Sequence, residues 1–181
     1  LEPALAVNSA TAATPAPTAS ATPAPTPSPT PTPAPSAERI AAVQAIVKPQ
    51  TADAGDDEYL YGFRLWEAKF YPEAQQQLQS VIDRYPSHSR ISYARNLLGR
   101  SYLDDNKPGT AAPIFLNNYR TTPRGDRAPD SLLYLGVSMS RRNDATRACA
   151  SFAELIEVYP DIASGRLATQ LARAKAEARC N

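Results

Sequence analysis

Residues 132–152 read LLYLGVSMSRRNDATRACASF, and the pattern of a glycine, an alanine and a large apolar residue occurs twice more upstream. Residues 95–115 read RNLLGRSYLDDNKPGTAAPIF, and residues 58–78 read EYLYGFRLWEAKFYPEAQQQL. Four kinds of position recur with a spacing of 37 residues: Gly62, Gly99 and Gly136; Ala74, Ala111 and Ala148; Leu78, Phe115 and Phe152; Pro86, Pro123 and Pro160. A period of this length is typical of proteins that stack one supersecondary unit after another.

Each recurring position has a physical reason in a pair of antiparallel helices. Small side chains at the glycine and the alanine let the two helices approach closely, and the large residue one turn after the alanine fills the space between them. The proline ends the second helix. The pattern predicts helix pairs at 56–69 with 72–84, 90–104 with 110–121, and 128–141 with 144–158. A last helix between Ser164 and Arg179 would cap the stack with polar side chains.

This spacing resembles the tetratricopeptide repeat, lengthened by three residues in each unit. The resemblance covers about residues 56–179 and implies an all-α solenoid of three helix pairs plus a C-terminal capping helix. The implied domain is 56–181, with repeats at about 55–88, 92–125 and 129–162 and the capping helix at about 163–179.

The N-terminal segment has a different composition. Residues 1–36 hold ten of the 18 prolines and no aromatic residue, so they are predicted to be a disordered linker rich in Pro, Ala and Thr. Every second residue from Pro23 to Pro35 is proline, which favours an extended polyproline II spacer over a docking motif. Residues 37–55 are predicted to form a short helix, which ends at Pro49, and then a connector.

Composition argues against several functional classes. Nineteen basic residues balance 18 acidic ones and the pI is about 7.9, which disfavours nucleic-acid binding. No apolar run approaches the roughly 20 residues of a membrane span. The single histidine, His88, is expected in a turn between repeats, without partners for catalysis or a metal. We therefore expect no enzyme, no cofactor and no metal.

The chain does not begin with Met, and we expect a mature form whose signal peptide has been removed.

A solenoid of this kind has a concave face lined by the first helix of each pair. Aromatic and arginine side chains there are typical interface anchors. An alternative is that the first aromatic cluster, between 59 and 66, packs under the segment 40–47 instead. The predicted groove residues are Tyr59, Phe63, Trp66, Glu67, Tyr93, Asn96, Arg100, Leu103, Leu133, Val137 and Arg141.

The two cysteines fall near helix ends. Cys149 lies near the start of the last paired helix, and Cys180 lies at the end of the final helix. If these helices are antiparallel neighbours, a disulfide between them would staple the final helix to the solenoid, given an oxidising compartment. The alternative is one buried thiol and one exposed terminal thiol.

Further details resemble one family of repeat proteins, the periplasmic cell division coordinator CpoB, or YbgF, of the Tol–Pal system. They are the three 37-residue units behind a Pro-rich linker, the pairs Tyr85-Pro86 and Tyr159-Pro160, and the position of Cys149 after Arg147-Ala148. The resemblance implies a non-enzymatic periplasmic scaffold whose protein partners are TolA and the peptidoglycan synthesis machinery. Members also carry an N-terminal coiled coil that forms oligomers, but no sustained heptads occur here. Another envelope scaffold, for outer-membrane assembly or secretion, is the alternative.

Overall fold

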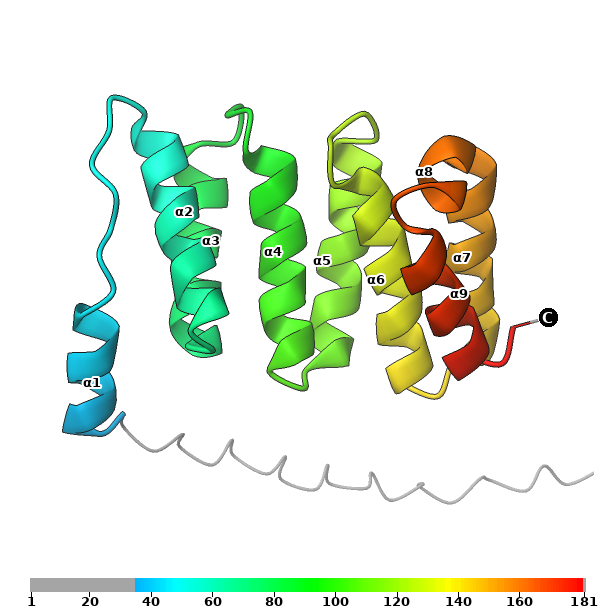
Figure 1. The fold of residues 1–181 in the computed structure, drawn as a ribbon, viewed down its shortest axis with the longest axis horizontal. Helices are drawn as coiled ribbons and strands as arrows, with labels where there is room; N and C mark the ends of the chain where they lie inside the picture. Colours follow the sequence, from blue (N-terminus) through cyan, green and yellow to red (C-terminus); the bar gives the residue numbers. More distant parts are fainter. Residues whose placement is uncertain (1–34, 181) are drawn as a thin grey trace, which may run out of the picture. The chain divides into compact units, whose positions relative to one another are not determined.

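The computed structural model describes residues 35–180, which belong to one compact unit. The linker and polyproline predictions for residues 1–36 therefore lie almost wholly outside the described residues. Every regular element between residues 35 and 180 is a helix (Figure 1). The elements are α1 (Ala37–Gln44), α2 (Ala54–Glu67), α3 (Tyr71–Arg84), α4 (Ile91–Asp104), α5 (Pro108–Thr121), α6 (Ala128–Arg141), α7 (Ala145–Val158), α8 (Pro160–Ser164) and α9 (Ala168–Glu177).

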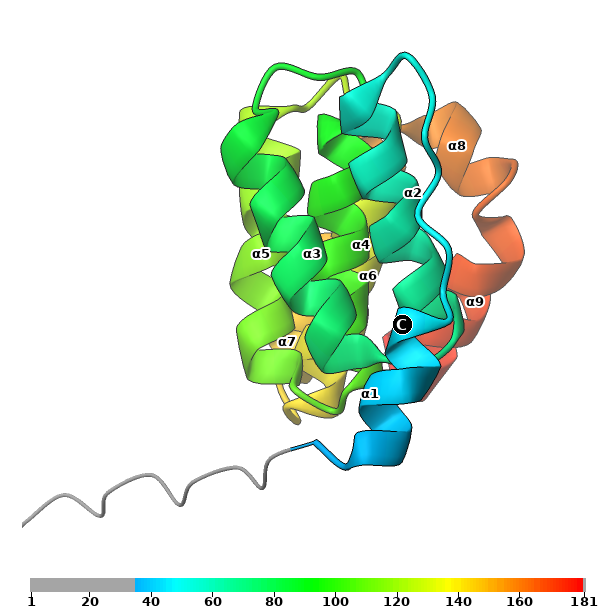
Figure 2. The same ribbon diagram turned by 90° about the vertical axis from the view of Figure 1, so that its left-hand side faces the viewer.

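Helices α2 to α7 form three antiparallel pairs that stack in chain order. Figure 2 shows the first helices of the pairs, α2, α4 and α6, in one layer and the second helices, α3, α5 and α7, in another. Helix α9 packs against α6 and α7. The predicted three pairs and a C-terminal capping helix are confirmed. Among the helices of residues 35–180, none has both the length and the apolar character needed to cross a membrane.

The C-terminal region differs from the prediction in one respect. Pro160 was expected to end a helix and lead into a turn, but it also begins α8, because proline is well suited to the first position of a helix. The short α8 ends at Ser164, and α9 begins only at Ala168. The capping region is therefore two helices and not one.

The recurring small and large residues meet as predicted between the helices of each pair. Ala111 and Phe115 on α5 are fully buried, as are their equivalents in the other two repeats. A Cβ atom added to Gly99 on α4 would lie 2.6 Å from Cε1 of Phe115, so no larger residue fits there without movement. The glycine is thus required by close helix approach and not by backbone conformation.

A fifth position with the same period was missed by the sequence analysis. Lys69, Asn106 and Asn143 are 37 residues apart, and all three have positive φ angles, of 65°, 57° and 60°. Each follows the first helix of a pair and turns the chain into the second helix. Asn is one of the few residues that tolerate this left-handed conformation, so the two asparagines were a readable signal.

Polar contacts hold the N-terminal segment on the first repeat. Arg39 on α1 forms two hydrogen bonds with the Glu73 carboxylate, at 2.8 and 2.7 Å, and its guanidinium lies 5.0 Å from the Phe70 ring centroid. Lys48 donates a 2.6 Å hydrogen bond to Glu58. Asp53 is the N-cap of α2, and its side chain accepts a hydrogen bond from Asp56 N–H.

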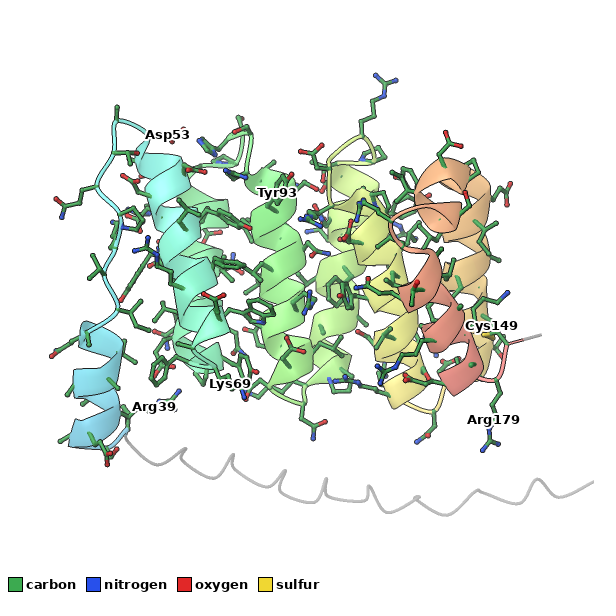
Figure 3. All side chains as sticks on the ribbon, in the orientation of Figure 1. Arg39, Asp53, Lys69, Tyr93, Cys149 and Arg179 are labelled. Atoms are coloured by element: carbon green, nitrogen blue, oxygen red, sulfur yellow. A yellow bond between two sulfur atoms is a disulfide. The ribbon has the colours of Figure 1, made fainter. Side chains whose placement is uncertain are left out.

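The two cysteines are joined. Cys149 on α7 and Cys180, which follows α9, form a disulfide with their Cα atoms 5.5 Å apart. Figure 3 labels Cys149 and Arg179, the neighbour of Cys180, at the same end of the stack. The bond ties the final helix to the last helix pair.

Candidate partner-binding groove

The first helices of the three repeats share a continuous line of side chains, which we call the inner face. It consists of Phe63, Trp66, Arg100, Asp104, Tyr134, Val137 and Arg141. The rings of Phe63 and Trp66 are 5.7 Å apart on α2. The Arg100 guanidinium of α4 lies 4.8 Å from the Trp66 ring centroid and 4.5 Å from that of Tyr134 on α6. Side chains of three repeats are therefore in direct contact on this face.

Arg100 is the centre of this line. Its side chain is 27% exposed, and its Nε is buried without a hydrogen-bond partner among residues 35–180. Asp104, one turn further on, lies 3.9 Å from the guanidinium and accepts a 2.8 Å hydrogen bond from Nε1 of Trp66. A planar guanidinium between two rings is favoured by cation–π attraction and held in one orientation.

A depression between α6 and α9 continues the inner face toward the C-terminus. Tyr134, Val137 and Arg141 line it from α6, and Ala174 and Glu177 line it from α9. Arg141 is exposed and donates a 2.9 Å hydrogen bond to the carbonyl of Leu103. Burial raises the pKa of the Tyr134 hydroxyl, against the opposing effect of Arg100. The depression combines apolar walls with charged groups at its rim.

The structure distributes the predicted groove residues unevenly. Phe63, Trp66, Arg100 and Val137 are half-buried on the inner face, and Arg141 and Glu67 are exposed. The structure corrects four others, Tyr59, Asn96, Leu103 and Leu133, because they are buried and present little or no surface to a partner.

The buried four have identifiable roles inside the protein. Asn96 donates a 3.0 Å hydrogen bond to Ser131 Oγ between α4 and α6. Leu103 and Leu133 are only 2% and 1% exposed, and both belong to the core cluster that includes Leu171 and Ala174 of α9. Tyr59 packs edge-on against Tyr93 with 6.1 Å between ring centroids. Repeat register therefore did not determine which side chains are exposed.

Two inner-face residues were missed, Tyr134 and Asp104. Asp104 stands midway in register between Glu67 and Arg141, with 37 residues to each, so the period alone could have identified it. Tyr134 is equivalent by register to Leu97, which is buried. The repeat register alone does not distinguish these two positions. Tyr134 is half-buried, whereas the shorter Leu97 is buried.

Tyr93 lies apart from the inner face, at the edge where the first helices begin. Figure 3 labels it with Asp53 at this edge. The Arg90 and Arg127 guanidinium groups lie 5.3 and 4.9 Å from its ring centroid. Arg90 pairs with Asp56. Each arginine therefore bridges two successive repeats.

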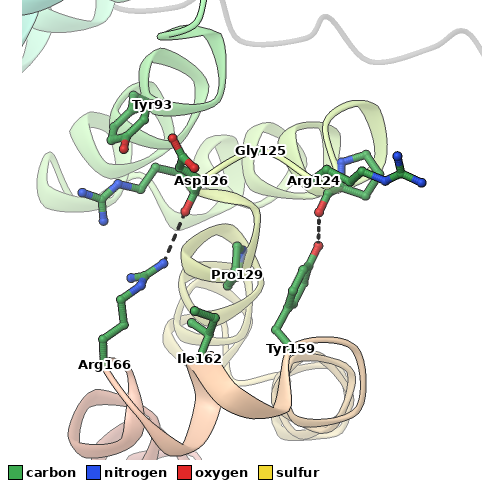
Figure 4. Close-up of a pocket in the computed structure, with 10 residues that line it drawn as sticks. Tyr93, Arg124, Gly125, Asp126, Pro129, Tyr159, Ile162 and Arg166 are labelled. Carbon is green, nitrogen blue, oxygen red and sulfur yellow. Dashed lines mark hydrogen bonds between the residues drawn. The ribbon is translucent and has the colours of Figure 1, made fainter.

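Figure 4 shows a second depression at this edge, between the α5–α6 turn and α8. The Tyr159 hydroxyl donates a 2.6 Å hydrogen bond to the Pro123 carbonyl. The Asp130 carboxylate pairs with both Arg127 and Arg166, at 3.0 and 2.5 Å. Because these guanidinium groups are neutralised within the protein, we assign this edge to inter-repeat contact, and the inner face remains the candidate site.

Comparisons with known proteins agree with this geometry. Residues 130–161 match the tetratricopeptide repeat family. The crystal structure of PcrH from Pseudomonas aeruginosa superposes with a TM-score of 0.57 and 16% sequence identity, over 75% of this chain and 96% of that one. The fold is a tetratricopeptide-repeat solenoid. Tetratricopeptide-repeat solenoids typically act as scaffolds for protein–protein interaction, and their curved surfaces bind partners.

A second tetratricopeptide-repeat-like neighbour is more distant. The structure of a MamA RS-1 ArsTM double mutant has a TM-score of 0.49 and 14% identity, over 71% of this chain and 75% of that one. No curated protein matches the chain. Within residues 35–180, no group of three His, Cys, Asp or Glu side chains is placed to hold a metal ion.

Proposed function

We propose that this chain is a periplasmic scaffold that holds a segment of a partner protein on its inner face. The observation that carries the proposal is the Trp66–Arg100–Tyr134 stack beside the α6–α9 depression. Aromatic and arginine side chains are the residue types that most often anchor protein interfaces. Because Arg100 is already held by two rings, little side-chain entropy is lost when a partner binds.

The surface chemistry favours a helical or extended segment held largely by apolar contacts. Phe63, Trp66, Tyr134 and Val137 supply apolar area, whereas Arg100 and Arg141 supply the positive charge and Asp104 the negative charge. Because the inner face carries both positive and negative charges, it suits a partner segment with an apolar stripe and a few flanking charges of either sign.

The disulfide supports the periplasmic part of the proposal. Cys149 and Cys180 are the only cysteines in the chain, and they are bonded to each other. Stable disulfides of this kind persist in oxidising compartments and are rare in the cytosol. A bond that closes 31 residues at the end of the solenoid is a structural feature that such a compartment would maintain.

The resemblance to the CpoB family supports specific partners. It supports TolA as the protein held on the inner face and peptidoglycan synthesis enzymes as further partners. On this proposal the scaffold coordinates the Tol–Pal system and septal peptidoglycan synthesis with outer-membrane constriction during division. The repeat spacing and the position of Cys149 are the sequence features that support it.

Calorimetry with the full 181-residue chain and the periplasmic helical region of TolA tests this function. Val137→Lys and Arg141→Glu alter the inner face at a half-buried and an exposed position, and we expect each to weaken binding at least tenfold while circular dichroism shows an unchanged fold. Arg120→Glu, on the exposed face of α5, is the matched control and should bind like the wild type.

The outcomes separate the general proposal from its refinement. Saturable binding weakened only by the inner-face variants supports both. If TolA does not bind at high micromolar concentration, the Tol–Pal refinement is wrong. Crosslinking from position 137 in bacterial envelopes would then show whether another envelope assembly partner occupies the inner face. Equal binding by all variants would remove the inner face as the site.

A further inference from the structure

The large apolar side chains that stay exposed lie at the two ends of the described solenoid. Ile40 and Val47 are 45% and 70% exposed, in and just after α1. Ile156 and Val158 on α7 are each 43% exposed. These four are the large exposed hydrophobic residues of the chain between 35 and 180, and Figure 1 shows α1 and α7 at opposite ends of the stack. Terminal units of a solenoid normally present polar outer faces, so this distribution needs an explanation.

The C-terminal end presents a shallow groove. It is lined by Ile156 of α7, by Ala163 of α8, and by Leu171, Ala172 and Ala176 of α9. The first helices α2, α4 and α6 are each covered by a second helix, whereas the groove beside α9 leaves Ile156 43% exposed. An incoming helix at this end would bury apolar surface that the chain itself leaves in water.

The N-terminal end presents a short helix of matching character. None of the residues of α1 is buried, although Val43 and Ile46 pack against the core cluster that includes Leu65 and Leu78 of the first repeat. The Arg39–Glu73 pair fixes α1 on α3. With one side of α1 held in this way, Ile40 still remains 45% exposed and offers an apolar side chain to another surface.

We propose that α1 of one copy docks in the α7–α9 groove of a second copy, so that copies of this chain associate head to tail. The charges are complementary: Glu38 lies on α1 and Lys175 lines the groove, and neither has an ion-pair partner within residues 35–180. Both halves of the contact are present on every chain, and for this reason a second copy fits better than an unrelated partner. Because the two surfaces differ, the contact is heterologous and can extend beyond a dimer.

The contact involves one short helix, so the association should be weak and dependent on concentration. Sedimentation velocity of the full chain, from low micromolar to near-millimolar concentration, should show a weight-average mass that rises beyond that of a monomer. Ile40→Glu, which blocks the α1 end, and Ile156→Glu, which blocks the groove, should each remain monomeric over the same range.

Mixing the two variants gives the decisive measurement. The Ile156→Glu chain keeps an intact α1 and the Ile40→Glu chain keeps an intact groove, so an equimolar mixture should form a dimer that does not grow further. Val47→Glu serves as a second N-terminal variant if circular dichroism shows that Ile40→Glu unfolds α1. Asn117→Glu, exposed on the middle repeat, should associate like the wild type.

Three results would overturn the proposal. The first is a wild-type chain that stays monomeric at every concentration. The second is a mixture of the two blocked variants that stays monomeric. The third is association that Ile156→Glu abolishes and both N-terminal variants leave intact, because this would indicate a symmetric contact between two grooves.

Discussion

The guanidinium carbon of Arg100 lies 4.8 Å from the centroid of the Trp66 ring, across the boundary between the first and second repeats. The same group reaches Tyr134 in the third repeat. One side chain therefore connects the inner surfaces of all three helix pairs. A partner meets a face whose aromatic rings are already ordered, and such preorganisation favours affinity.

Replacement of Arg100 should loosen this face. Arg100→Met keeps an unbranched apolar stem and removes both cation–π contacts, so we expect the free energy of unfolding to fall by about 1–2 kcal/mol. Trp66 is the only tryptophan, so its emission should move to longer wavelength in the folded variant. Urea unfolding followed by fluorescence measures both effects. Arg120→Met is the control, and an equal loss in that variant would show that the stack contributes nothing specific.

Because α4 and α5 approach closely, adding a single methyl group at Gly99 should lower the stability of the fold. Gly99→Ala would place a Cβ 2.6 Å from the fully buried Phe115 ring, and we expect a destabilisation of about 1–2 kcal/mol despite the better helix propensity of alanine. Gly109→Ala is the matched substitution in open space, since the nearest atom, of Arg142, lies 4.0 Å away. Thermal unfolding should show it neutral or slightly stabilising. Similar losses in both variants would contradict the packing explanation.

Loss of the disulfide should act mainly on the C-terminal helix. The double variant Cys149→Ser, Cys180→Ser removes a crosslink between residues 31 apart, and we expect roughly 3–4 kcal/mol lower stability. Hydrogen exchange should rise most in α9, which the bond ties to α7. Uniform exchange across all repeats, or no loss of stability, would show that packing alone holds α9. The oxidised wild type under the same conditions is the reference.

Glu58 should make the fold sensitive to acid. Burial alone would raise the pKa of Glu58, but hydrogen bonds from Lys48, Gln77 and Arg84 lower it to about 2, from 4.5. A carboxylate with a lowered pKa stabilises the folded state fully above the unfolded-state value, and this contribution disappears as the pH falls from about 4.5 to about 2. The contribution is roughly 2–3 kcal/mol at neutral pH.

Urea midpoints between pH 2 and 7 measure this dependence. Glu58→Gln should be less stable than the wild type at pH 7 and should lose less stability as the pH falls. Glu67→Gln, an exposed residue on the same helix, should keep the wild-type profile. Parallel profiles for the wild type and Glu58→Gln would assign the acid sensitivity to other carboxylates.

Most of the fold could be read from the spacing of a few residue types. Gly99, Ala111 and Phe115 have equivalents 37 residues before and after, and in the structure these positions meet between the two helices of each pair. Pro108 stands at the first position of α5, two residues before the predicted start, because proline needs no hydrogen-bond acceptor there. The sequence analysis predicted that Pro160 ends a helix but missed that it also begins α8. A proline has no backbone N–H and cannot continue a helix, but for the same reason it fits the first position of the next one.

The sequence by itself determined the period, the helix pairs and the placement of both cysteines at helix ends. These are consequences of local geometry, which residue size and backbone preference dictate. Only the tertiary structure decided that Leu133 is buried while Tyr134 beside it reaches the surface, and that Arg100 lies between two rings. Exposure depends on which side chains other helices bring to the same place, and those helices lie a repeat or more away in the chain.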